Sequence, residues 1–161
     1  MAKCSAGLLM FRRTPDSVEV LLVHPGGPFF RNKDLGSWSI PKGEYPADED
    51  PLSAARREFE EETGLAPAGD FRPLGQIRQA GGKLVTAWAF EGDCDPATLH
   101  SNSFSLEWPR GSGKLREFPE VDRIEWFPLP LARQKILAGQ SPFLDRLLTL
   151  LGGVDQSEPR P

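Results

Sequence analysis

The sequence predicts a single α/β domain in which a mixed β-sheet is sandwiched between α-helices. Segments typical of strands precede and follow one strongly helical, acidic segment, and two further helical segments close the chain. The length of 161 residues, with 39% hydrophobic and 26% charged residues, is ordinary for one globular domain with its own core. We therefore expect one domain over residues 1–151, followed by a disordered tail over residues 152–161.

The first half of the chain supplies apolar segments separated by clear turn and loop signals. The second of these segments is rich in β-branched residues, as strands are. Proline and glycine mark the connections between them. In chain order we expect strands over residues 5–13 and 18–24, a Gly/Pro-rich loop over residues 25–37 and a short extended segment over residues 38–40.

A helix is predicted from about Pro51 to Thr63. Proline suits the first turn of a helix, where its missing N–H is not needed. The acids at residues 48–50 put negative charge at that end, which the helix dipole favours. Gly64, just past the last periodic residue, is a C-cap candidate.

The second half of the chain continues with a hairpin and ends in two helices. Gly81-Gly82 is a common hairpin dipeptide, and Ser141 with Pro142 is expected to start the last helix, with Ser141 as its cap. The expected elements are hairpin strands over residues 71–80 and 84–91, strands over 103–108 and 121–127, a basic Gly-containing loop over 110–119, and helices over 128–137 and 141–151.

Charge and composition exclude several classes of function. The net charge of −4 gives no general reason to expect binding to nucleic acid or to a membrane surface. No apolar stretch approaches the ~20 residues of a membrane span, and the N-terminus is a poor signal peptide. Cys4 and Cys94 show no metal-like spacing. We expect a cytoplasmic enzyme with a small-molecule substrate, and its oligomeric state stays open.

The acidic run in the predicted helix indicates a metal site. At about 100° per residue, Glu58, Glu61 and Glu62 lie along one side of the helix, beginning at the edge of the apolar stripe. Glu60 projects from a different side and is expected to be idle. Like charges at positions 58 and 62 destabilise a helix unless a cation lies among them. A hard divalent ion prefers such oxygen ligands.

Residues 43–65, GEYPADEDPLSAARREFEEETGL, resemble the box of the Nudix hydrolase family. Every fixed position of that box is filled, and the one mild departure is Phe59 at a position that is more often aliphatic. The resemblance implies the Nudix fold and an enzyme that hydrolyses a diphosphate linked to another group. It covers residues 3 to 151, although only the box is highly specific.

The resemblance also implies roles for particular residues. The expected ligands of Mg²⁺ or Mn²⁺ are Gly43, through its carbonyl, with Glu58, Glu61 and Glu62. Glu61 is also an expected catalytic residue, and Arg57, four residues before it, is expected to steady it. Glu49 is expected to be an outer ligand or a structural acid.

A general base is expected on a loop far downstream of the box. The segment from Pro119 to Trp126 resembles the equivalent stretch of animal-type diadenosine tetraphosphate hydrolases, in which a Glu lies six residues before a Trp. That position is Glu120 here, and Glu117 is the second candidate.

Substrate contacts are expected from residues outside the acidic run. The same hydrolases carry a Trp and then Pro-Lys-Gly before the box, which corresponds to Trp38 and Lys42. Arg116, with Arg110 and Lys114, belongs to the basic loop that is expected to meet outer phosphates. Aromatic faces can stack on a base, and the candidates are Phe29, Phe30, Trp88 and Trp108.

Several substrate classes remain open. A dinucleoside polyphosphate and a nucleoside triphosphate are almost equally supported, and a diphosphoinositol polyphosphate is an alternative because of the basic loop. A non-catalytic nucleotide sensor is the alternative from another functional class. An intact box favours the enzyme.

Overall fold

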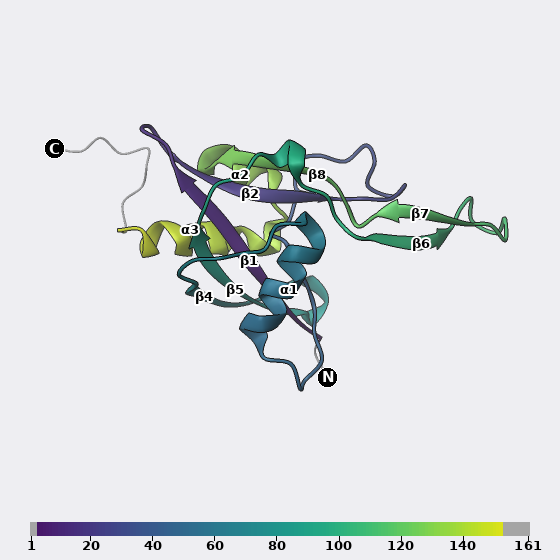
Figure 1. The fold of residues 1–161 in the computed structure, drawn as a ribbon, viewed down its shortest axis with the longest axis horizontal. Coiled ribbons are helices and arrows are strands. Elements are labelled where there is room, and N and C mark those ends of the chain that lie inside the picture. The colour runs from purple at the N-terminus through teal and green to yellow at the C-terminus, as the bar shows by residue number, and fades with distance from the viewer. Residues whose placement is uncertain (1–2, 153–161) are drawn as a thin grey trace.

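The computed structural model describes residues 3–152 and confirms the mixed α/β architecture (Figure 1). The expected tail lies, apart from Gly152, outside the described residues. Within residues 3–152, no helix has both the length and the apolarity that crossing a bilayer requires.

Most of the secondary structure follows the expected order, with small shifts at the ends of elements. Strands also form at residues 42–44 and 115–119, where none was expected, and the expected extended segment over residues 38–40 makes isolated bridges through Trp38 and Ser39. The strands are β1 (Cys4–Arg13), β2 (Val18–Pro25), β3 (Lys42–Glu44), β4 (Arg72–Arg78), β5 (Leu84–Glu91), β6 (Ser103–Glu107), β7 (Leu115–Pro119) and β8 (Val121–Pro128). The α-helices are α1 (Pro51–Thr63), α2 (Leu129–Lys135) and α3 (Ser141–Leu150).

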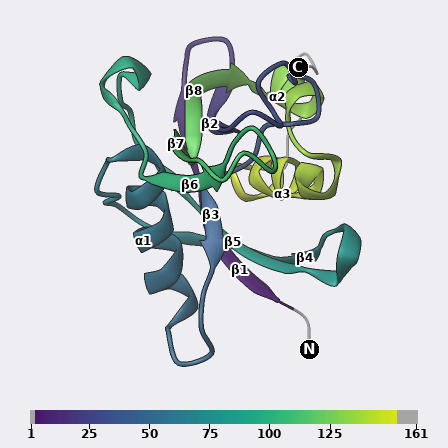
Figure 2. The ribbon, with the colours of Figure 1, turned by 90° about the vertical axis from the view of Figure 1, so that its right-hand side faces the viewer.

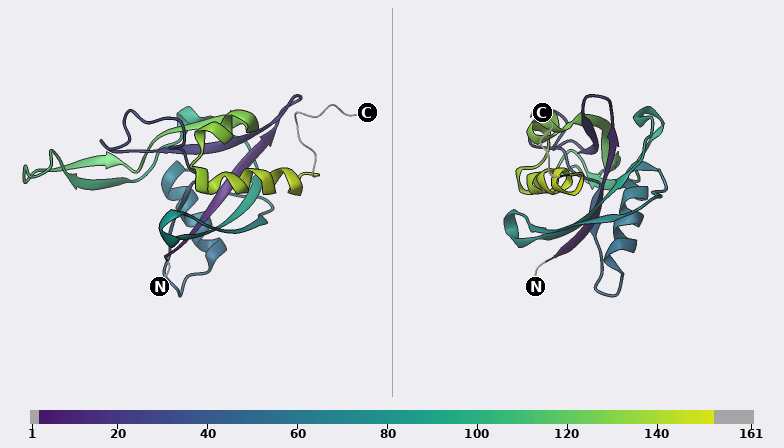
Figure 3. Two further views of the ribbon diagram at one scale, coloured as in Figure 1. Left: turned by 180° about the vertical axis from the view of Figure 1, so that it is seen from behind. Right: turned by 90° about the vertical axis from the view of Figure 1, so that its left-hand side faces the viewer.

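The main sheet is mixed. Its strands lie in the order β4-β5-β1-β2-β8, and β3 pairs with one end of β1. The long central strand β1 runs parallel to β5 and antiparallel to β2. Figure 3 shows α1 on one face of this sheet and α2 and α3 on the other. The sheet is therefore packed between helices, as predicted.

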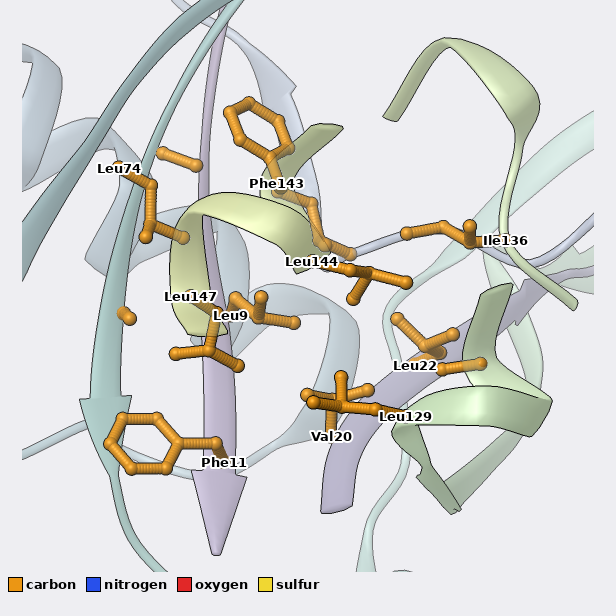
Figure 4. Packing of buried hydrophobic residues seen from close by; sticks show 14 of the residues in the cluster. Leu9, Phe11, Val20, Leu22, Leu74, Leu129, Ile136, Phe143, Leu144 and Leu147 are labelled. Atoms are coloured by element: carbon orange, nitrogen blue, oxygen red, sulfur yellow. The ribbon is translucent and has the colours of Figure 1, made fainter. Parts of the chain in front are cut away.

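Alternation along β1 divides the core into two layers. Successive side chains of a strand point to opposite faces. Leu9 and Phe11 pack with α2 and α3, where Phe143 and Leu147 are fully buried (Figure 4). Burial of such side chains stabilises the fold by roughly 1.5–3 kcal/mol each.

The other face of the sheet holds α1 in place. Leu8 and Met10 of β1 pack in the same buried cluster as Ala55 and Phe59 of α1. The ring of Phe59 meets that of Phe90 edge to face, with centroids 5.4 Å apart. The apolar stripe of α1 is thus buried against β1 and β5, which fixes the direction in which its carboxylates point.

A two-stranded arm extends away from the main sheet. It consists of β6 and β7 with the turn between them, residues 103–119, and pairs in the register Phe104–Phe118 and Leu106–Arg116 (Figures 1 and 2). The sequence predicted a loop over residues 110–119, which is wrong for residues 115–119. Those residues are mostly exposed, so no hydrophobic alternation marked them as a strand.

The start of the last helix also differs from the expectation. Gln140, and not Ser141, is the N-cap residue, and it makes no side-chain cap hydrogen bond. Its buried side chain instead accepts a hydrogen bond from the backbone N–H of Ile40 and donates one to Oγ of Ser39. This contact ties the C-terminal helix to the extended segment before β3.

Candidate active site

Helix α1 begins and ends where local signals placed it. The carboxylate of Asp50 accepts from the backbone N–H of Ser53, which caps the N-terminus. Gly64 has a φ of 78°, a left-handed conformation that glycine adopts without strain. Glu58 is buried, with 9% of its surface exposed, whereas Glu60 is exposed. The acidic side of the helix thus faces the protein, and Glu60 faces solvent.

Arg57 gathers three carboxylates around one guanidinium. Its Nε and Nη2 donate to the two oxygens of Glu49 at 2.9 and 2.8 Å, which is a bidentate fork. Its Nη1 donates to Glu58 at 2.6 Å and to Glu61 at 3.2 Å. These bonds, the fork to Glu49 first, raise the pKa of Arg57. The side chain holds the loop before α1 against the acidic side of the helix.

Gly43 lies directly against Glu58. A Cβ built at position 43 would overlap Oε1 and the carboxyl carbon of Glu58. A side chain at position 43 would therefore have to displace the carboxylate of Glu58, which approaches strand β3 closely. The arrangement brings the Gly43 backbone beside a buried acid, although the two residues are 15 positions apart in the sequence.

A cavity of about 240 Å³ opens beside this cluster. Three charged residues from separate segments line it, namely Lys42 of β3, Glu62 of α1 and Glu120, which lies just before β8. The remaining lining residues are Val23, Pro25, Phe30, Ser37, Ser39, Val121 and Leu137. The fold therefore brings Lys42 and Glu120, which are 78 positions apart in the sequence, into one hollow.

Burial dominates the electrostatics of this cavity. Burial raises the pKa of Glu62 to about 8, and the charge of Lys42 acts in the opposite direction. Burial likewise lowers the pKa of Lys42, with the neighbouring charge of Lys83 acting in the same sense. The pKa of Glu120 is raised by burial and then by the charge of Glu61.

The residues around the cavity fit a hard divalent cation. Burial, and then the neighbouring charge of Glu61, raises the pKa of Glu58, while Arg57 opposes the shift. Carboxylates that are costly to ionise without a cation are suited to Mg²⁺ or Mn²⁺. Within residues 3–152 no group of three His, Cys, Asp or Glu side chains is already arranged to hold an ion, and the carboxylates of Glu58 and Glu61 accept hydrogen bonds from Arg57.

The backbone connects Glu120 to α1. The N–H of Glu120 donates to the carbonyl of Asn102 at 2.8 Å, and the N–H of Asn102 donates to the carbonyl of Glu61 at 2.8 Å. The carbonyl of Glu120 accepts from Gly26 at 2.9 Å. Glu117 does not line the cavity and lies on β7 opposite Ser105. Of the two acids, Glu120 is the one beside Glu62.

Two expected substrate residues lie elsewhere. Trp38 is fully buried, its indole N–H donates to Asp34, and its ring packs edge to face on Phe127. Direct contact of Trp38 with a substrate is therefore an expectation that the structure corrects. Arg116 lies on the arm, stacks on Phe118 and does not line the cavity.

The sequence did not single out Ser37, Ser39 or Leu137, which line the cavity. The two serines flank the buried Trp38, so the alternation of an extended segment was a signal that they face the other way. Leu137 had no such signal, because its place depends on how the chain between α2 and α3 packs. Of the aromatic candidates, only Phe30 lines the cavity.

The comparisons with known proteins agree with this fold. The family described as NUDIX domain matches residues 3–147. An Ap4A hydrolase binary complex from C. elegans has a TM-score of 0.66 and 22% identity, and the match covers 93% of this chain and 99% of that one.

Two further structures have the same fold. The NUDIX domain of Shewanella oneidensis NrtR, complexed with ADP ribose, has a TM-score of 0.65 and 18% identity, over 94% of this chain and 89% of that one. A MutT protein from Methanosarcina mazei Go1 has a TM-score of 0.60 and 20% identity, over 94% and 96%. No curated protein sequence matches the chain.

The family match spans nearly all of the described residues, including the cavity and the acidic helix. The resemblance of residues 43–65 and the fold lead to the same result. The chain belongs to the NUDIX family and is a pyrophosphohydrolase of that family.

Proposed function

We propose that this enzyme uses Mg²⁺ or Mn²⁺ to cleave a diphosphate linkage in a nucleotide, either a dinucleoside polyphosphate or a nucleoside triphosphate. The observation that carries the proposal is the shared cavity of Lys42, Glu62 and Glu120 beside the Gly43–Glu58 contact. A cavity lined by one lysine and two carboxylates suits a polyanion that arrives with a divalent ion.

The metal would be held by the carboxylates of Glu58, Glu61 and Glu62 and by the carbonyl of Gly43. When bound, it supplies positive charge that stabilises the phosphate oxygens in the transition state. Arg57 is a positioning residue in this proposal, because its guanidinium contacts the ligand carboxylates and not the cavity. Glu49 orients Arg57 through the bidentate fork.

Lys42 and Glu120 have complementary roles. Lys42, which lines the cavity, contributes a point charge to a substrate phosphate. Glu120 accepts the proton of the attacking water, since its raised pKa suits a general base. The two side chains come from β3 and from the residue before β8, so they reach the cavity from different elements.

The substrate class is supported by the cavity and by a structural relative. Phe30 is 37% exposed and gives the cavity an aromatic wall. One similar structure is of an Ap4A hydrolase. A second similar structure is of a NUDIX domain complexed with ADP ribose. The alternative function is therefore a non-catalytic domain that binds a nucleotide.

A phosphate-release screen tests the proposal. The enzyme is incubated with nucleoside triphosphates, dinucleoside polyphosphates, diphosphoinositol polyphosphates and ADP-ribose, each with Mg²⁺ or Mn²⁺. We expect metal-dependent release from a nucleotide. Tight binding of ADP-ribose without hydrolysis of any compound in the panel would instead establish a non-catalytic nucleotide sensor. Full activity after thorough chelation would refute the dependence on a divalent metal.

A further inference from the structure

The arm has two chemically different faces. In an antiparallel pair, directly opposite residues share a face. The pairs Phe104–Phe118 and Leu106–Arg116 place aromatic, aliphatic and basic side chains on one face, whereas Ser105–Glu117 belongs to the other. The aromatic–basic face comprises Phe104, Leu106, Trp108, Lys114, Arg116 and Phe118.

The loop over residues 25–37 lies along the aromatic–basic face. An ideal Cβ at Gly27 would lie 3.0 Å from Cζ of Phe104, near the base of the arm. Further out, the rings of Phe29 and Trp108 meet at 84° with centroids 5.5 Å apart. Phe30, the next residue, lines the catalytic cavity. The loop therefore links the cavity, through Phe30, to the arm, through Gly27 and Phe29.

Basic residues recur along the loop and the arm. Within residues 3–152, no salt bridge involves any of five cations of the loop and the arm. They are Arg31, Lys33, Arg110, Lys114 and Arg116. In a chain of net charge −4, cations that have no salt-bridge partner in the described residues are complementary to an anion.

The basic residues follow one another outward from Glu120. Arg116 is four residues before Glu120 along an extended strand, a distance of roughly 13 Å at about 3.3 Å per residue. The backbone N–H of Trp108 donates to the carbonyl of Lys114, so these two residues lie side by side. Lys114 is six residues before Glu120, a distance of roughly 20 Å along the strand. A mononucleotide cleaved at the cavity would not extend that far, whereas a substrate with a nucleoside at each end would.

We propose that the loop and the aromatic–basic face of the arm form an extended binding site for the distal half of a dinucleoside polyphosphate. Arg116 and Lys114 contact outer phosphates. The exposed ring of Phe29, held edge to face by Trp108, stacks on the second base. This inference rests on the proposed hydrolase activity and selects the longer of its two substrate classes.

Steady-state kinetics of Lys114→Gln/Arg116→Gln test the phosphate contacts. Diadenosine tetraphosphate is the long substrate and adenosine triphosphate the short one. We expect KM for the long substrate to rise about fivefold to twentyfold, at roughly two- to fivefold for each exposed ion contact. The kcat and the KM for the short substrate should stay within about twofold.

The control removes two charges elsewhere. Lys3→Gln/Arg78→Gln has the same net charge, and both of its positions are exposed and outside the loop and the arm. It should leave both KM values unchanged. Added salt should raise the KM of the unchanged enzyme for the long substrate, and Lys114→Gln/Arg116→Gln should flatten that dependence.

Phe29 tests the stacking contact. Phe29→Leu should raise KM for the long substrate by about fivefold or more, and Phe29→Tyr should restore it, because both rings stack. If the unchanged enzyme hydrolyses the long substrate while every arm and loop variant keeps its KM, the extended site is refuted. Absence of hydrolysis by the unchanged enzyme would overturn the proposed function as well.

Discussion

The buried ring of His24 connects Asp122 to the loop over residues 25–37. Its Nδ1 lies 2.7 Å from Oδ1 of Asp122 and its Nε2 lies 2.6 Å from the carbonyl oxygen of Lys33. A carboxylate and a carbonyl both accept hydrogen bonds, so each ring nitrogen lies against an acceptor oxygen. Asp122 is two residues after Glu120, and Lys33 is three after Phe30. One imidazole thus connects the segment that contains Glu120 to the loop that contains Phe30, and both of these residues line the cavity.

We expect His24→Phe to lower the free energy of unfolding by about 1–3 kcal/mol, because the ring volume stays while Asp122 and the carbonyl of Lys33 both lose their hydrogen-bond partner. Urea denaturation measures the change. Asp122→Asn keeps an oxygen acceptor and should cost less. If His24→Phe were as stable as the unchanged protein, the hydrogen bonds of His24 would contribute nothing to the free energy of unfolding.

The acidic helix face predicts opposite outcomes for two neighbouring acids. Glu62→Gln should lower kcat/KM at least about 100-fold while the fold stays intact, since a metal ligand is lost without a change in volume. Glu60→Gln should be nearly silent, because that side chain is exposed to solvent. Kinetics and circular dichroism of both variants check this, and comparable damage from Glu60→Gln would contradict the assignment of the face.

The loop acids make a second matched pair. Glu120→Gln should lower kcat by roughly 10²–10⁴, the usual contribution of a positioned base, and change KM much less. Glu117→Gln should be mild because Glu117 lies on the arm, outside the cavity. If neither variant is impaired, the base lies within α1, where Glu58 and Glu61 are the candidates.

Removal of metal should lower the melting temperature. A ligand at about 100 times its Kd adds about 2.7 kcal/mol, which is several degrees for a domain of this size. Thermal melts with Mn²⁺ or with chelator measure the difference. Glu62→Gln should lose most of the gain and Glu60→Gln should keep it. An equal gain in both variants would place the ion elsewhere.

The chelated protein should lose stability as the pH rises from about 5 to 8. The pKa of Glu62 is about 8 in the fold against an ordinary 4.5, so the folded state holds its proton more tightly over that range. The raised pKa values of Glu58 and Glu120 act in the same sense, whereas the lowered pKa of Lys42 acts oppositely.

Unfolding measured at several pH values in chelator tests this dependence. Glu62→Gln should flatten the dependence of stability on pH, because it removes the acid of the cavity whose pKa is shifted most. Saturating Mn²⁺ should flatten it as well, since the ion favours the ionised carboxylate. A profile that Glu62→Gln leaves unchanged would rule out Glu62 as its origin.

Local chemistry let the sequence determine helix α1 and the order of its acids. The determinants of this helix act over only a few positions of the chain. They are the fixed φ of Pro51, the left-handed conformation of Gly64 and the constant rotation per residue of an α-helix. They therefore predicted both ends of the helix, the i,i+4 contact of Arg57 with Glu61 and the exposure of Glu60.

Only the tertiary structure decided what surrounds that helix. Trp38 is buried because β2 and α2 close over it, and residues 115–119 form a strand because β6 pairs with them. The resemblance had named Glu120 but not Leu137, and both reach the cavity through contacts between segments distant in sequence. Such contacts depend on which elements pack together, and a residue's near neighbours in the chain carry no record of that choice.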